Sequence, residues 1–159
     1  MRGAQAGSVS AIEALFRLHW PHAYRAAYLV VHESAAAEDI AQEAFLAAIR
    51  RLDRFDKERP FGPWLHRIVV NRAIDFVRAR QLRSEVELGE AFAPERAADV
   101  SDATVAALAA LTPEHRAVIV LRHLLGYTPG EIAELLNLPR GTVNSRLRRG
   151  LDMLRETVA

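Results

Sequence analysis

The sequence predicts an all-α protein of two small helical domains joined by a flexible acidic linker. Apolar residues recur at intervals of three and four along most of the 159 residues. No stretch alternates strictly between apolar and polar residues, as a half-exposed strand would. Charge is also segregated, because two arginine-rich stretches, 64–83 and 139–159, flank the acidic stretch 84–102. These observations predict helical domains at 10–82 and 102–159.

The composition is that of a globular protein with a packed core, with 50% hydrophobic and 26% charged residues. The chain has no cysteine, which excludes disulfides, thiol nucleophiles and cysteine-based metal sites. The first ten residues lack the apolar segment of a signal peptide, and no apolar run reaches the roughly 20 residues that a membrane span needs. We therefore expect a cytoplasmic protein without membrane insertion.

Three helices are expected in the first domain. The first covers residues 10–31. The second follows Ser34, whose hydroxyl is suited to cap it, and runs to about residue 52. A polar loop at 53–59 leads to a third helix, which opens near Pro60 to Pro63 and continues to about Leu82. Residues 83–101 show no sustained periodicity and contain Gly89 and Pro94, so this stretch is expected to be the exposed linker.

The second domain is expected to begin with a short helix over 102–111, followed by a helix capped by Thr112 and ended by Gly126. Thr128 to Glu131 has the pattern of a capping box, which predicts the start of the next helix. That helix ends near Leu136. A turn through Asn137 leads to a final helix over 140–157, so the last two helices predict a helix-turn-helix.

The final helix has two distinct faces. Val143, Leu147, Leu151 and Leu154 share one side, and small, polar and cationic residues occupy the other. This pattern favours insertion into a DNA major groove over a merely solvated surface. In the first domain, aromatic residues alternate with arginines, which suits binding of unpaired bases. The competing interpretation is that Trp64 and Phe76 are core residues, whereas Phe61, beside the loop, is less certain.

Three segments together resemble one protein family. They are Asp39 to Phe45 (DIAQEAF), residues 61–80 (FGPWLHRIVVNRAIDFVRAR) and residues 111–155, which begin LTPEHRAVIVLR. In this order they resemble the extracytoplasmic-function (ECF) sigma factors of bacterial RNA polymerase. The resemblance covers about residues 11–82 and 105–156. It implies a sigma region 2 bundle followed by a sigma region 4 helix-turn-helix.

The resemblance also implies roles for particular residues. Asp39, Gln42 and Glu43 would dock on core RNA polymerase. The minus-ten promoter element, including an unpaired non-template base, would be bound by Asp56, Lys57, Arg59, Phe61, Arg67, Asn71, Arg72, Asp75 and Arg78. The minus-thirty-five duplex would be bound by Arg140, Thr142, Asn144, Ser145, Arg146, Arg148 and Arg149.

Among the residues for the minus-thirty-five duplex, those that would read bases are Asn144, Ser145 and Arg149. Those that would hold phosphates are Arg140, Arg146 and Arg148. Many family members carry a basic residue where this chain has Asn144, and asparagine favours adenine. An anti-sigma factor is a further partner that the resemblance implies. It implies no cofactor and no enzymatic activity.

Two other function classes remain as alternatives. A stand-alone helix-turn-helix regulator would use the first domain as a sensor or dimerisation module, and it would bind DNA without polymerase. An enzyme would have to rely on the six histidines. His19 and His22 are three residues apart on one helix, but no further ligands follow at metal-binding spacing, so no metal site is expected.

Overall fold

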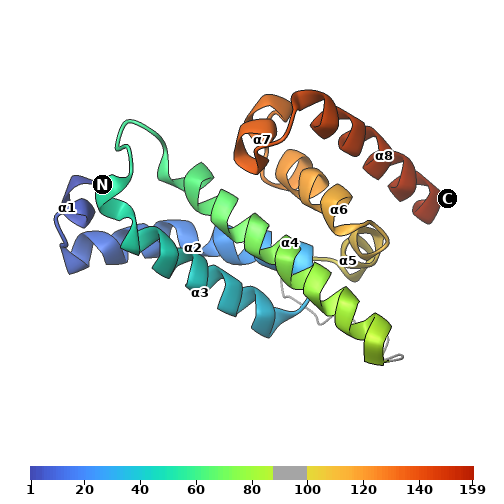
Figure 1. Cartoon of the computed structure of the whole chain (residues 1–159), viewed down its shortest axis with the longest axis horizontal. Helices are drawn as coiled ribbons and strands as arrows, with labels where there is room; N and C mark the ends of the chain where they lie inside the picture. Colours follow the sequence, from blue (N-terminus) through green and yellow to red (C-terminus); the bar gives the residue numbers. More distant parts are fainter. Residues whose placement is uncertain (88–99) are drawn as a thin grey trace.

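The computed structural model describes residues 1–87 and 100–159. Its helices are α1 (Arg2–Gln5), α2 (Val9–Val31), α3 (Ser34–Arg50), the short 3₁₀ helix η1 (Leu52–Arg54), α4 (Phe61–Glu87), α5 (Asp102–Ala109), α6 (Pro113–Ile119), the π-helical turn η2 (Val120–Leu124), α7 (Pro129–Leu136) and α8 (Arg140–Val158). All regular structure in the described ranges is helical, which confirms the all-α prediction (Figure 1). Most of the predicted linker, residues 88–99, lies outside the described residues.

The first half, residues 1–87, is a bundle in which α2, α3 and α4 each pack on the other two (Figure 1). Small side chains line these interfaces and let the helix backbones approach closely. The fully buried alanines are Ala23, Ala26 and Ala27 in α2, and Ala37, Ala41, Ala44 and Ala48 in α3. Leu65, Val69, Val70 and Val77 of α4 fill the remaining core. The burial of apolar surface at these positions is the main source of stability for this half.

Two details of the first half differ from the sequence prediction. The prediction that Ser34 caps the second helix is wrong, because Ser34 is already the first helical residue and Glu33 precedes it without a side-chain cap bond. The Ser34 hydroxyl instead pairs with the Tyr24 hydroxyl at 3.0 Å. The third helix does not end at Leu82 but continues to Glu87, into the predicted linker. The short helices α1 and η1 were not predicted.

The second half, residues 100–159, follows the predicted order of helices. Thr112 accepts a hydrogen bond from the backbone of His115 and starts α6. Beyond Ile119 the helix continues as the π-helical turn η2. Gly126, with φ 78°, follows this turn and ends the helix as predicted. The capping box between Thr128 and Glu131 is present, with both of its hydrogen bonds formed.

The helix-turn-helix consists of α7 and α8. Asn137 joins them in the left-handed conformation, with φ 53°, as its side chain and position predicted. Val143 and Leu147 of α8 are buried, which confirms the inward face of that helix. At Gly150 the backbone of α8 comes so close to α6 that an added Cβ would lie 3.0 Å from Cγ1 of Ile119.

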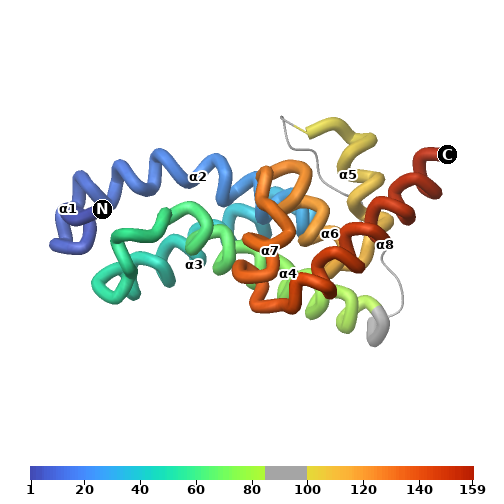
Figure 2. Tube along the Cα trace, turned by 90° about the horizontal axis from the view of Figure 1, so that it is seen from above, coloured from blue at the N-terminus to red at the C-terminus, as the bar shows by residue number. Residues whose placement is uncertain are grey.

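The two halves pack against each other, with α6 and α7 lying on α4, and with α5, α6 and η2 also contacting α2. Figure 1 shows α7 and α8 on the side of α4 opposite α3, and in Figure 2, seen from above, α7 is drawn over α4. We call this the closed arrangement. Within residues 1–87 and 100–159, no helix combines the length and apolar character required to span a bilayer.

Candidate nucleic-acid interface

The outer face of α8 carries the residues predicted to bind duplex DNA. Arg140, Asn144, Arg148 and Arg149 are all exposed to solvent. The exposed Gly141 leaves open space beside the first turn, because nothing lies within 4 Å of a Cβ placed there. The exposed groups therefore combine hydrogen-bonding and cationic side chains with room for close approach of a DNA backbone.

The remaining predicted residues of α8 are less available. Thr142, Ser145 and Arg146 are half-buried. The positive charges of Arg146 and Arg149 both act on His115 of α6, and that of Arg146 also acts on Glu114. Arg146 differs from Arg148 and Arg149 in being half-buried.

The residues predicted for the minus-ten element gather on one side of the first half. Arg67, Asn71, Asp75 and Arg78 are exposed at helical spacing along α4, and Arg72 is half-buried beside them. The loop before α4 adds an acidic residue, Asp56, and two cations, Lys57 and Arg59. Asp56 shapes this loop, because it accepts a hydrogen bond from the backbone of Glu58 at 3.0 Å and lies 3.8 Å from Nε of Arg59.

Phe61 does not belong to this surface. It is only 6% exposed and lies in an aromatic cluster with Phe45, Phe55 and Trp64, with ring centroids between 5.7 and 6.3 Å away. The prediction of a base contact by Phe61 is therefore corrected, since a ring enclosed on these sides has no face left for a nucleobase. Trp64 is half-buried and stacks on Phe55 at 4.6 Å.

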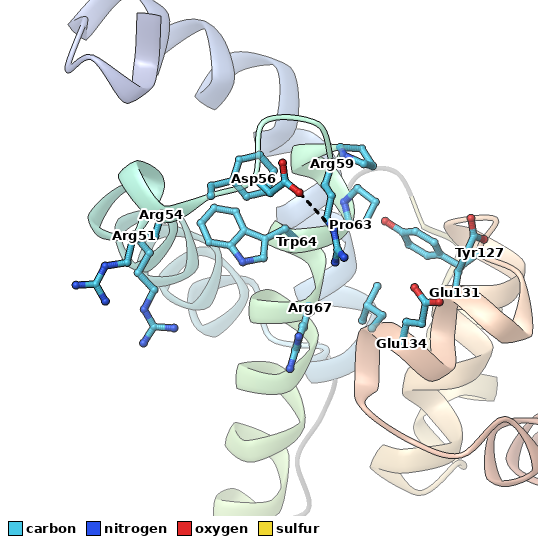
Figure 3. Close-up of a pocket in the computed structure, with 13 residues that line it drawn as sticks. Arg51, Arg54, Asp56, Arg59, Pro63, Trp64, Arg67, Tyr127, Glu131 and Glu134 are labelled. Carbon is cyan, nitrogen blue, oxygen red and sulfur yellow. Dashed lines mark ion pairs between the residues drawn. The ribbon is translucent and has the colours of Figure 1, made fainter. Parts of the chain in front are cut away.

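A cleft of about 880 Å³ lies between the two halves at this end of α4. One wall carries four arginines, which we call the arginine wall: Arg51, Arg54, Arg59 and Arg67. The opposite wall is formed by Tyr127, Glu131 and Glu134 of the second half, as Figure 3 shows. The closed arrangement therefore sets carboxylates opposite cations that are suited to DNA phosphates.

A third surface lies on α3. Asp39, Gln42 and Glu43, which were predicted to dock on the polymerase, are all exposed. Leu46, at 52% exposure, continues the same helical face one turn later. The sequence argument missed this leucine, although its spacing of three and four residues from Glu43 and Gln42 was the available signal.

Comparison with known proteins gives two family matches. The profile of Sigma-70 region 2 matches residues 15–83, and that of Sigma-70 region 4 matches residues 101–154. The ECF RNA polymerase sigma factor SigW of Bacillus subtilis (strain 168) is 34% identical over 84% of this chain and 81% of its own length. RNA polymerase sigma factor CarQ of Myxococcus xanthus is 34% identical over 94% of this chain and 90% of its own.

This chain belongs to the ECF sigma factors.

Solved structures agree with the fold of this sigma factor. CnrH, solved in complex with the cytosolic domain of CnrY, matches with a TM-score of 0.75 and 28% identity over 99% of this chain and 93% of its own. The sigma factor RpoE from Bartonella quintana, in complex with the anti-sigma factor NepR, matches with a TM-score of 0.77 and 24% identity over 94% and 98% of the two chains. The second likeness concerns the fold alone.

Polar contacts between described residues join the two halves of the sigma factor. The Tyr127 hydroxyl and Nδ1 of His66 lie 2.6 Å apart. Arg78 of α4 donates from Nε to Glu114 of α6 at 2.7 Å. Burial by itself would raise the pKa of Glu114, but the hydrogen bond from Arg78 and nearby positive charge hold it below its usual value. In the closed arrangement Arg78 is therefore engaged within the protein.

Arg116, which is 5% exposed, makes a further contact between the halves. Its guanidinium donates to the backbone carbonyls of Leu108, Ala109 and Leu111 in its own half and to that of Val30 in the first half. Burial, together with the charge of Arg80, lowers its pKa to about 10, so it remains charged at neutral pH. Sequence reasoning missed this residue.

The sequence did contain a signal that the side chain of Arg116 is buried. It stands in an apolar helix, three residues after Pro113 and four before Val120, and both of these are buried. A cation at an inward position needs acceptors, and the carbonyls at a helix end supply them. No group of side chains within residues 1–87 and 100–159 forms a cluster suited to a metal ion.

Proposed function

We propose that this sigma factor binds core RNA polymerase through the exposed face of α3 and directs it to promoters with two separate DNA-binding surfaces. The α3 face consists of Asp39, Gln42, Glu43 and Leu46. Its acidic and apolar character suits a polymerase surface that offers cations around an apolar patch. The protein acts by binding and carries no catalytic site of its own in this proposal, and it works in the cytoplasm, where the polymerase and chromosome are.

The observation that carries the proposal is the outer face of α8. This helix follows a complete helix-turn-helix, and its exposed Asn144, Arg148 and Arg149 stand where such helices contact base edges and phosphates. We assign it to the minus-thirty-five element. Asn144 carries a donor and an acceptor that suit adenine, and Arg149 suits guanine.

The second surface comprises the loop from Asp56 to Arg59 and the exposed face of α4. Arg67, Asn71, Arg72 and Asp75 would bind the minus-ten element, with Trp64 and Phe55 as the aromatic pair nearest the loop. Arg78 would contact the minus-ten element only after its hydrogen bond to Glu114 is broken. This division corresponds to domains at about 10–82 and 102–159, with α4 extending into the intervening linker.

We also propose that a protein of the anti-sigma class binds this chain. Support comes from CnrH, which shares 28% identity and was solved with the cytosolic domain of CnrY. The cleft between the halves offers such a partner both cationic and acidic walls.

The test of the proposed function is transcription in vitro with purified core polymerase over a library of randomised promoters. We expect transcripts only when the protein is present, and an enriched pair of separated sequence elements among the active templates. A footprint by the protein alone on the same DNA, with no dependence on core polymerase, would instead support the stand-alone regulator. The comparisons with known proteins do not favour that alternative.

A further inference from the structure

Two buried histidines lie where the two halves of the molecule meet. His66 of α4 is 7% exposed, and its Nδ1 lies 2.6 Å from the hydroxyl of Tyr127 in the second half. His32, which follows α2, is 2% exposed, and its Nε2 lies 2.7 Å from the carbonyl oxygen of Leu29. Arg116, a residue of the second half, acts on His32 through its charge. Each histidine therefore has a neighbour that separation of the halves would remove.

The surroundings of His66 suit only a neutral imidazole. Its Nε2 is buried and has no hydrogen-bond partner. A protonated imidazole has two N–H donors, and only one of them has an acceptor here, the oxygen of Tyr127. The titratable and charged groups around it are His19 and His22 of α2, Arg67 on its own helix, and Arg122, Tyr127 and Glu131 of the second half.

The two histidines of α2 oppose a charge on His66. Burial first, and then the charges of His22 and His19, lower the pKa of His66 to about 4. Glu131 is an acid, but it is already engaged by the backbone of Thr128 at 2.7 Å. A proton on His66 therefore enters a site that offers it neither water nor a free anion.

His32 is in a similar position at the other end of the contact between the halves. Burial first, and then the positive charge of Arg116, lower its pKa to about 4, against a smaller opposing effect of its bond to Leu29. The charged groups on the elements around it are Arg80 of α4, Glu33, Arg116 of α6 and, at the start of α5, Asp102. Glu33 is shared with Arg80, which lies 3.5 Å away.

We propose that proton uptake by His66 and His32 opens the closed arrangement, so that the contact between the halves is an acid-sensitive latch over the arginine wall. In the open form Tyr127, Glu131 and Glu134 leave the cleft, and water reaches both imidazoles. Arg59 and Arg67, which are exposed in both forms, then no longer face the carboxylates of Glu131 and Glu134, which compete electrostatically with DNA phosphates. This role rests on the proposed function, in which the arginine wall lies beside the minus-ten surface.

The direction of the effect follows from the two protonation states. A histidine that is neutral in the closed form and titrates normally in the open form favours closure above pH 6.5. That preference is lost as the pH falls from 6.5 towards 4. Between pH 7.5 and 5.5 each such histidine lowers the ratio of closed to open molecules about tenfold, for an open-state pKa of about 6.5.

The test measures this ratio directly in the full-length protein. The chain has no cysteine, so Ala35→Cys in α3 and Glu156→Cys in α8, both exposed, accept a donor and an acceptor dye without competing sites. Single-molecule energy transfer then counts closed and open molecules at pH 7.5 and 5.5. No polymerase or DNA is present, so a negative result here leaves the transcription test of the proposed function unaffected.

Three variants make the outcome specific. His66→Gln keeps a hydrogen-bonding side chain that does not titrate, and His32→Asn suits the left-handed backbone at this position, where φ is 58°. Between pH 7.5 and 5.5, the change in the ratio of closed to open molecules should be about tenfold smaller in each single variant than in the parent protein. In the double variant the ratio should hardly change with pH. His123→Gln, at an exposed histidine of the second half, should keep the full response. A constant ratio in the parent protein, or an undiminished response in the double variant, would overturn the proposal.

Discussion

Arg72 of α4 donates to the carboxylate of Glu43 of α3 at 3.0 Å, so a residue assigned to promoter DNA pairs with a residue assigned to RNA polymerase. Both side chains are largely exposed, at 41% and 63%. An exposed pair of this kind contributes little to folding, roughly 0 to 1 kcal/mol. Its significance is positional, because each partner restrains the other's side chain on adjoining surfaces.

Removal of either partner should therefore affect both activities more than it affects stability. For Glu43→Gln we expect weaker binding to core polymerase and an altered minus-ten preference, with the free energy of unfolding changed by less than about 1 kcal/mol. A double-mutant cycle with Arg72→Gln, read out by transcription in vitro and by urea unfolding, measures the coupling. Strictly additive effects on transcription would show that the pair has no joint role.

Arg149→Ala tests the assignment of α8. If Arg149 pairs with a guanine, its loss should cost about 1 to 3 kcal/mol at one base of the upstream element and relax the preference there. Transcription from templates that vary at each upstream position measures this. Arg155→Ala is the matched control, because Arg155 lies on the same helix and pairs with Asp152. An unchanged preference in Arg149→Ala would contradict the assignment.

Arg116→Leu should destabilise the protein by about 3 kcal/mol, because it removes the buried guanidinium that donates to the carbonyls of Leu108, Leu111 and Val30. Urea unfolding followed by circular dichroism measures the loss. Arg17→Leu is the control, since Arg17 is exposed and pairs only with Glu13 one turn away. Equal stability of the two variants would mean that the buried guanidinium is not a stabilising group.

The pH dependence of unfolding provides a separate check on the buried histidines. Because burial lowers the pKa of His32 and of His66 to about 4, the unfolded chain binds more protons than the folded one between pH 6.5 and 4. Stability should therefore be highest above pH 6.5 and fall as the pH decreases through this window. For molecules that stay closed, the expected loss at pH 5 relative to pH 7.5 is about 2 kcal/mol for each histidine, and opening reduces it. A flat profile between pH 7.5 and 5.5 in urea titrations, with the fraction of closed molecules unchanged, would contradict this assignment.

Much of the fold was accessible from sequence because its signals are local. The capping box at Thr128, the left-handed turn at Asn137 and the apolar face of α8 each depend on residues a few positions apart, and all three predictions are confirmed. The prediction that Ser34 caps α3 was wrong because a more distant residue competes for its hydroxyl. A serine before a helix is a general capping signal, but here Tyr24, ten residues away, takes its hydroxyl.

The site was predictable only in part, since exposure depends on what packs across the chain. Phe61 resembled a candidate for base stacking, but Phe45 of α3 and Phe55 after η1 enclose it together with Trp64 of its own helix. Arg78 was assigned to DNA, but its partner Glu114 lies 36 residues further along. The pairing of His66 with Tyr127 spans 61 residues and left no periodic trace in the sequence.

The arrangement of acceptors around Arg116 bears on how readily the molecule changes shape. Its bonds to Leu108, Ala109 and Leu111 lie within residues 100–159, and only the bond to Val30 crosses to the first half. If the halves separate as proposed, a water molecule takes the place of Val30 as the acceptor for Arg116. The other bonds of the guanidinium would persist, so the C-terminal unit would move as a preassembled body.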